Sequence, residues 1–352
     1  MRKKLLILFS IMLMISVISA VFISLTGTKP KEKEEKLTIV TSFYPIYVAA
    51  GNIVSDMDNI ELINLAENQT GCLHDYQLTT KDMKKLENAD IFIINGGGIE
   101  GFATDIVKNY PDITIVDSST GIEFLPSMEE HGHSHEEENS ISEEQYIEEE
   151  HEKEEHEKEE HEEEDHEEEE HTKDEDHDHE HGELNPHIWL DPDNYIRQVE
   201  NIKNGLAKYD KSHEEEYNEN AAVYEEKIKQ IKEELVTELR DPKNKDVVIF
   251  HDSFAYLAKK LGLDVVHTVN IEADTSLSAG EIKEVIEEIK LHGVKVLFSE
   301  EQYSRDIPLN IARESGAEVY VIDSLVTGDG DKDSYIRGMK TNIETLKKAL
   351  YE

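Results

Sequence analysis

A histidine framed by proline and tryptophan follows directly on a stretch of chain that is built almost entirely of Glu, Asp and His. The framed histidine is His187, within Asn185-Pro186-His187-Ile188-Trp189, and the stretch covers residues 129–183. Imidazole is the commonest side-chain ligand for transition-metal ions at neutral pH. The combination predicts a protein that handles a transition metal.

Further candidate ligands stand where predicted strands end. His251 directly follows a strand predicted at residues 246–250, and Asp323 follows one at 318–322. His74 lies in the loop after a strand that ends at residue 65. In open α/β sheets, ligands bind at the carboxyl ends of the strands. A lone histidine is more often structural than a ligand, but a His or Asp directly after a buried-type strand favours the ligand interpretation.

The elements that must position these residues alternate along the chain. In the first part, strands are predicted at 37–40, 60–65, 89–95 and 112–116, with helices at 45–54 and 79–87. This alternation of strand and helix is typical of a parallel sheet flanked by helices.

A long helix is predicted to join this part to a second one. Residues 211–241 contain neither Gly nor Pro, and their apolar residues recur at helical spacing, which gives one apolar face. A second alternation of strands and helices then runs from residue 246 to residue 350. We expect an α/β fold of two similar lobes with parallel sheets, joined by a long rigid helix, with the metal site in the interlobe cleft.

The length and the net charge of the chain limit the class of protein to which it can belong. The 352 residues allow two domains of ordinary size. The formal net charge of −44 excludes nucleic acid and anionic lipid surfaces as partners. Residues 129–183 contribute −27 of that charge, from 30 acids and 3 lysines.

The acidic stretch itself is predicted to be a disordered insert. Five of its histidines recur at every fifth position, and five residues advance 500° around a helix, so these side chains would spiral around it. Dense like charge also opposes a stable helix. These histidines are His151, His156, His161, His166 and His171.

The N-terminus is typical of an exported protein. A basic start, Met1-Arg2-Lys3-Lys4, precedes an uncharged apolar run at residues 5–25, so residues 1–28 are interpreted as a signal peptide or an N-terminal membrane anchor. Thr28 stands where a lipoprotein box would place its lipidated cysteine. Residues 29–36 form a charged tether. We therefore expect an extracytoplasmic protein at the outer face of the plasma membrane, and its single cysteine, Cys72, allows no intrachain disulfide.

Several motifs, in order along the chain, resemble those of the metal-binding solute-binding proteins of bacterial zinc and manganese ABC importers, known as the cluster A-I or cluster 9 family. They are His-Asp-Tyr at 74–76, Asn-Pro-His-Ile-Trp-Leu-Asp-Pro at 185–192, Phe-His-Asp-Ser-Phe at 250–254, Ser-Ala-Gly-Glu at 278–281, Phe-Ser-Glu-Glu-Gln at 298–302 and Ile-Asp-Ser-Leu at 322–325. The resemblance covers residues 37–352 without the insert.

The resemblance implies a metal site made of His74, His187, His251 and Asp323. Members that take manganese have an acid in the place of His251. Three imidazoles and one carboxylate suit Zn²⁺ in a tetrahedral site, whereas manganese prefers more oxygen. The family has proline immediately before the first histidine. Here Leu73 stands there, and whether the Cys72 thiolate contacts the metal is left open.

The expected function is a high-affinity zinc receptor that delivers Zn²⁺ to an ABC permease in the plasma membrane. The alternatives are a manganese or iron receptor of the same family, or a surface protein that buffers metal or acts as an adhesin. An enzyme is not expected, because the chain has no His-Glu-x-x-His arrangement and four protein ligands leave no position for a reacting water. A monomer is expected.

The expected organisation places the N-terminal lobe at 37–128, the insert at 129–183, the end of that lobe at 184–210, the linking helix at 211–241 and the C-terminal lobe at 242–352. Other residues receive supporting roles. Trp189 is expected to form a wall of the site, and Glu300 and Glu301 to bond the imidazole N–H groups. Three further histidines are expected at the surface or in packing: His213, His267 and His292.

Overall fold

The computed structural model describes residues 36–67, 71, 73, 76–127, 184–269 and 277–352, together with Met12 and Met14. The N-terminal signal or anchor is therefore outside the described residues, Met12 and Met14 apart, and the whole insert, His74 and Cys72 are outside them as well. Among the described residues, no helix has the length and apolar character needed to cross a membrane.

The N-terminal lobe is built on a four-stranded parallel sheet. Its strands are β1 (Leu37–Thr41), β2 (Ile60–Asn64), β3 (Ile91–Ile94) and β4 (Thr114–Asp117), in the order β2-β1-β3-β4. The helices of this lobe are α2 (Tyr44–Ile53), α3 (Thr80–Leu86) and α4 (Ala103–Asn109). The sequence did not predict α4, because this short helix buries Ile106 alone and so shows no apolar periodicity.

The C-terminal lobe repeats this plan. The strands β7 (Asp246–Ile249), β8 (Asp264–Thr268), β9 (Val296–Glu300) and β10 (Glu318–Ile322) form a parallel sheet in the order β10-β9-β7-β8. Helices α7 (Ala255–Leu261), α8 (Ala279–His292), α9 (Asp306–Ser315) and α10 (Ser334–Tyr351) complete it. The predicted class, two α/β lobes with parallel sheets, is confirmed.

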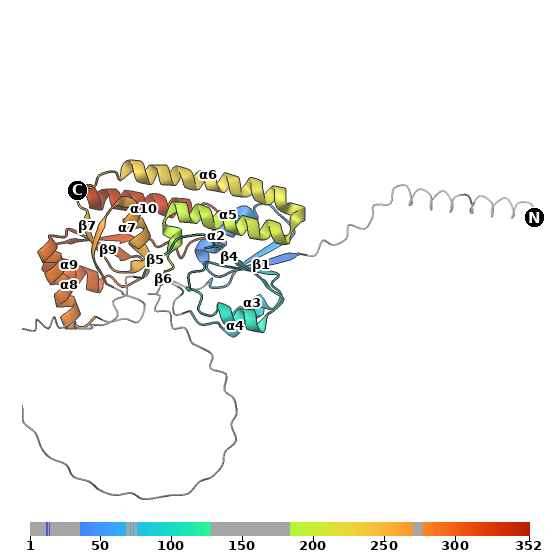
Figure 1. Cartoon of the computed structure of the whole chain (residues 1–352), viewed down its shortest axis with the longest axis horizontal. Helices are drawn as coiled ribbons and strands as arrows, with labels where there is room; N and C mark the ends of the chain where they lie inside the picture. The colour runs from blue at the N-terminus through green and yellow to red at the C-terminus, as the bar shows by residue number, and fades with distance from the viewer. Residues whose placement is uncertain are drawn as a thin grey trace, which may run out of the picture.

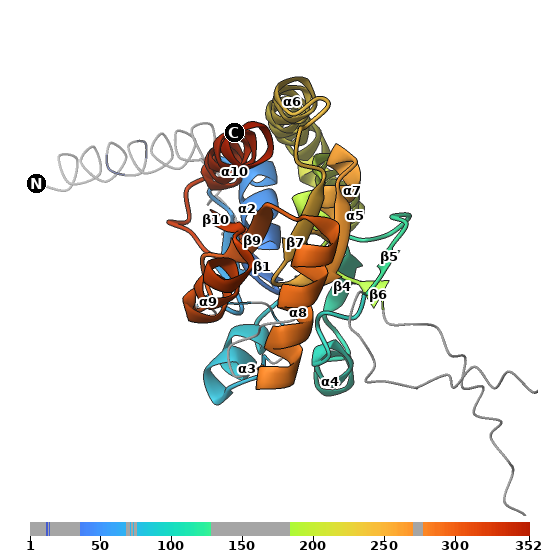
Figure 2. The same ribbon diagram turned by 90° about the vertical axis from the view of Figure 1, so that its left-hand side faces the viewer.

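Long helices run along one side of both sheets. Helix α6 (Glu214–Glu238) extends from one lobe to the other, with α5 (Pro192–Tyr209) and α10 beside it (Figure 1). The view from the end shows these helices opposite α3, α4, α8 and α9 (Figure 2). The regular part of the predicted joining helix is α6, and a short 3-10 turn at Lys211–His213 precedes it.

One apolar core joins the lobes through these helices. It includes Ile39 of the first sheet and Phe298 of the second, packed with Tyr195 of α5 and Ile228 of α6. The rings of Tyr195 and Tyr335 stack at 3.9 Å between centroids, so α5 and α10 are in direct contact. Because one core serves both lobes, their relative orientation is set by packing.

A two-residue antiparallel ladder lies between the lobes, made of β5 (Leu125–Pro126) and β6 (Leu184–Asn185) (Figure 1). These residues flank the insert on its two sides. The sequence did not predict the ladder, because a strand of two residues has no periodicity.

Candidate metal centre

Two of the predicted ligands come together where the lobes meet. His187, His251 and Asp252 each offer a ligand atom, and these atoms all lie within 4.8 Å of one another. All three side chains are buried, and the two imidazole rings have centroids 4.7 Å apart, edge to face. His187 follows β6 and His251 lies just beyond β7, so the group draws on both lobes.

The orientation of His251 is fixed by a carboxylate. Its Nδ1 lies 2.6 Å from Oε1 of Glu300, the last residue of β9, and this oxygen also accepts a hydrogen bond from Ser253 Oγ. Burial raises the pKa of Glu300, but the electrostatic interaction with His251 and the hydrogen bonds from His251 and Ser253 outweigh it and hold the pKa below its ordinary value. An ionised carboxylate only accepts, so Nδ1 carries the hydrogen and Nε2 keeps the lone pair that an imidazole needs to bind a metal.

The tautomer of His187 follows from the amide of Asn185. Oδ1 of Asn185 accepts from the His187 main-chain N–H at 3.0 Å, and its Nδ2 donates to the Asp252 carbonyl at 2.9 Å, which fixes the amide's orientation. Nδ1 of His187 then faces two oxygens, Asn185 Oδ1 at 2.9 Å and Asp252 Oδ1 at 3.2 Å. Both are acceptors, so Nδ1 carries the hydrogen and the lone pair is again on Nε2.

Aromatic side chains enclose the two imidazoles. Trp189 is fully buried with its ring centroid 5.4 Å from that of His187, and its Nε1 donates to the carbonyl of Ser324. Tyr303 lies edge to face against His251 at 5.8 Å. The expected role of Trp189 as a wall agrees with this arrangement.

Asp323 stands directly after β10, as predicted, but it is not a member of the group of three. Its Oδ1 accepts from the Leu325 N–H at 2.8 Å and from Gln302 Nε2 at 3.3 Å. Strand β9 lies between β10 and β7, so the strands that carry Asp323 and His251 are roughly 10 Å apart. Burial raises the pKa of Asp323. Its role as a ligand stays a prediction.

His74 lies outside the described residues, but two residues just before it are placed. Leu73 is buried in the shared core. A Cβ atom on Gly71 would lie 3.2 Å from the hydroxyl of Tyr303, the tyrosine that packs on His251. This segment of the N-terminal lobe therefore reaches the wall of the site. Cys72 is also outside the described residues.

Some of the residues outside the proposed ligand set have the contacts expected from the sequence. Glu300 bonds the N–H of a candidate ligand as expected, whereas Glu301 is exposed. His213 pairs with Asp210 at 2.6 Å and His292 with Glu288 at 3.3 Å, both in surface helices or turns. Asp252 was missed by sequence reasoning, although it is adjacent to His251 in a motif that follows a strand.

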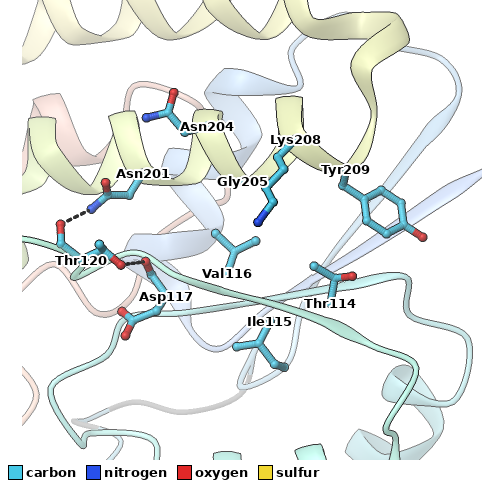
Figure 3. A pocket seen from close by; sticks show the side chains of 10 residues that line it. All are labelled: Thr114, Ile115, Val116, Asp117, Thr120, Asn201, Asn204, Gly205, Lys208 and Tyr209. Carbon is cyan, nitrogen blue, oxygen red and sulfur yellow. Dashed lines mark hydrogen bonds between the residues drawn. The ribbon is translucent and has the colours of Figure 1, made fainter.

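A hollow of about 560 Å³ lies elsewhere, between β4 and α5 (Figure 3). Its one carboxylate, Asp117, already accepts from the N–H and the hydroxyl of Ser119, at 2.8 and 2.7 Å. The side chain of Lys208 also projects into the hollow (Figure 3). With one engaged carboxylate and a lysine, the hollow offers no set of metal ligands, so the candidate centre is the group at His187.

The chain has two α/β lobes that share a joining helix, and the lobes meet at a buried group of imidazole and carboxylate side chains. This arrangement is that of a two-lobe solute-binding protein. The model of the family ZnuA, "Zinc-uptake complex component A periplasmic", matches residues 39–349, and the chain belongs to this family.

Individual relatives differ in the metal that their names give. The zinc-binding protein AdcA of Streptococcus pyogenes serotype M3 is 31% identical over 355 residues, which cover 99% of this chain and 61% of that protein. The chain thus spans less than two thirds of that relative. The iron-binding protein YfeA of Yersinia pestis is 28% identical over 97% of this chain and 94% of its own length. The Zn(II)-bound ZnuA-like domain of Streptococcus pneumoniae AdcA shares the fold, with a TM-score of 0.65 at 22% identity, covering 90% of this chain and all of that one.

Proposed function

We propose that this protein is the extracytoplasmic receptor of a zinc importer, which binds one Zn²⁺ between its lobes and delivers it to an ABC permease. The observation that carries the proposal is the pair of buried imidazoles from the two lobes, which lie with the Asp252 carboxylate in one group and each have Nδ1 bonded to oxygen. Zn²⁺ prefers such nitrogen donors in a buried tetrahedral site.

The proposed ligands are His74, His187, His251 and Asp323. Asp252 and Glu300 hold the imidazoles from behind, as partners of metal-bound histidines usually do. The family and the zinc-binding relatives support the choice of zinc.

The second candidate is a manganese or iron receptor. The Asp252 carboxylate lies with the two imidazoles, and it would supply, together with the proposed ligand Asp323, oxygen donors that these ions accept. The YfeA relative, matched over 94% of its own length, is an iron-binding protein. A buffering or adhesin role would rest on the insert, which is outside the described residues.

The location and the assembly belong to the same proposal. Residues 1–28 act as a signal peptide or membrane anchor, the insert binds further ions weakly, and the receptor acts as a monomer without catalytic activity. The proposed domain limits are those that the sequence predicts.

The test compares Zn²⁺, Mn²⁺ and Fe²⁺ in competition titrations with the whole chain and with His187→Ala and His251→Ala. Tight zinc binding that both substitutions abolish supports the receptor. Tight binding that survives both would contradict it, and a preference for Mn²⁺ or Fe²⁺ would favour the second candidate.

A further inference from the structure

The hydroxyl of Tyr256 joins both strands of the ladder at the base of the insert. Tyr256 belongs to α7 of the C-terminal lobe, and its hydroxyl accepts from the Leu125 N–H at 2.9 Å and donates to the Asn185 carbonyl at 2.7 Å. The side chain is 4% exposed. A two-stranded ladder of two residues is too short to hold itself together in water, so these bonds contribute to its order.

Asp252, in the turn before α7, makes two further contacts, one with the ladder and one with the residue that follows Pro126. Asn185 donates from Nδ2 to the Asp252 carbonyl, and Ser127 donates from Oγ to Asp252 Oδ2 at 3.2 Å. Residues 252–256 of one lobe thus hold the chain on both sides of the insert. We call this set of contacts, made by Tyr256 and Asp252 to Leu125, Ser127 and Asn185, the clasp.

The clasp leads directly to a candidate ligand. Asn185 is bonded through its carbonyl to Tyr256, and through Oδ1 to both the main-chain N–H and Nδ1 of His187. If the Tyr256 hydroxyl is removed, the buried carbonyl of Asn185 loses this partner, and the cost of an unsatisfied buried acceptor favours a shift of Asn185. The amide that fixes the His187 tautomer would shift with it.

We propose that Tyr256 is a positioning residue of the metal site, which acts through Asn185 on the orientation of His187 and thereby slows the loss of the bound ion. The proposal rests on the proposed function, because it requires His187 to be a ligand. It adds a role for a residue of α7, in the lobe opposite to the one that carries His187.

The test is Tyr256→Phe in the full chain loaded with one equivalent of Co²⁺, whose ligand-field spectrum reports the geometry of its ligands. We expect the spectrum to change, and the dissociation rate, measured by mixing with excess chelator, to rise about tenfold, which corresponds to about 1.4 kcal/mol. Unchanged rate and spectrum would overturn the proposal.

Tyr110→Phe is the matched control. It also removes a tyrosine hydroxyl that donates to a main-chain carbonyl, that of Met83 at 2.9 Å, and its ring packs against a separate apolar cluster that contains Phe102 and Ile106. This variant should leave the rate and the spectrum unchanged.

A double variant separates positioning from general stability. If Tyr256 acts through His187, adding Tyr256→Phe to His187→Ala should not accelerate dissociation further. Equal acceleration in both backgrounds would show a merely structural role and overturn the proposal. If His187→Ala alone leaves the rate and spectrum unchanged, the site assignment fails instead, so the two failures can be told apart.

Discussion

Nδ1 of His251 lies 2.6 Å from Oε1 of Glu300, and the two residues stand at the carboxyl ends of the neighbouring strands β7 and β9. The topology of the sheet brings them together, although 49 residues separate them in the chain. The carboxylate fixes the imidazole tautomer and makes its Nε2 a better donor.

Replacing Glu300 with Gln should therefore weaken zinc binding without unfolding the protein. The substitution keeps the shape of the side chain but removes the charge that supports His251, and loss of such a partner typically costs 10- to 100-fold in metal affinity. Competition against a chelator of known affinity measures the change. Glu301→Gln is the control, since Glu301 is exposed, and an equal effect of both substitutions would refute the role of Glu300.

Replacing His251 with Glu should shift the preference from Zn²⁺ toward Mn²⁺, because an oxygen donor takes the place of nitrogen. Competition between the two ions measures the ratio of affinities. His213→Ala should leave that ratio unchanged, because His213 bonds to Asp210 at the surface end of α5. If zinc preference persists in the His251 variant, this residue does not contact the ion.

Removal of the insert should leave one tight zinc site and abolish several weaker ones. We propose that gathering ligands from this acidic low-complexity segment costs chain entropy, so the sites of the insert should be weaker. Deletion of residues 129–183 leaves Ser127 and Met128 between the paired residues Pro126 and Leu184, the length of a two-residue hairpin. Calorimetric titration of the protein without residues 129–183 should show the tight phase of zinc binding and lack the weak phase. Loss of the tight phase would place the main site in the insert.

Glu100 predicts a pH dependence of stability that is independent of metal. Burial raises its pKa to about 7, against the lowering effect of hydrogen bonds from the Asn95 and Gly96 N–H groups. The folded state thus holds a proton that the unfolded state releases near its ordinary pKa of 4.5. The stabilisation is complete below that value and is lost as the pH rises to 7, by roughly 3 kcal/mol.

Chemical denaturation of the metal-free protein between pH 4.5 and 7.5 measures this effect. The free energy of unfolding of the wild type relative to Glu100→Gln should fall across that interval, because the variant has no proton to lose. A constant difference between the two proteins would show that Glu100 is ionised throughout.

The sequence predicted most of the elements because their signals are local. Helix α8 begins at Ala279 after Ser278, which caps it together with Glu281, and it ends before Gly293, whose positive φ of 67° suits glycine. Predicted and observed bounds of this helix agree. The paired strands of both sheets were likewise indicated by short β-branched runs.

The contacts around the site were less accessible to sequence reasoning. His187 and His251 could be named because each is set off by its neighbours in the chain, whereas Asp252 looked like an ordinary residue at the start of a turn. The partners of Tyr256 are 131 and 71 residues away, and no local pattern encodes such a pairing. Tertiary packing alone brings these groups together.

X-ray absorption at the zinc edge tests the central claim most directly, with one equivalent of Zn²⁺ bound to the protein that lacks residues 129–183. The account predicts a four-coordinate ion with three imidazoles at about 2.0 Å and one carboxylate, and the loss of one imidazole in His187→Ala. A first shell made of oxygen alone, or an imidazole signal that His187→Ala leaves unchanged, would contradict a zinc site between the lobes.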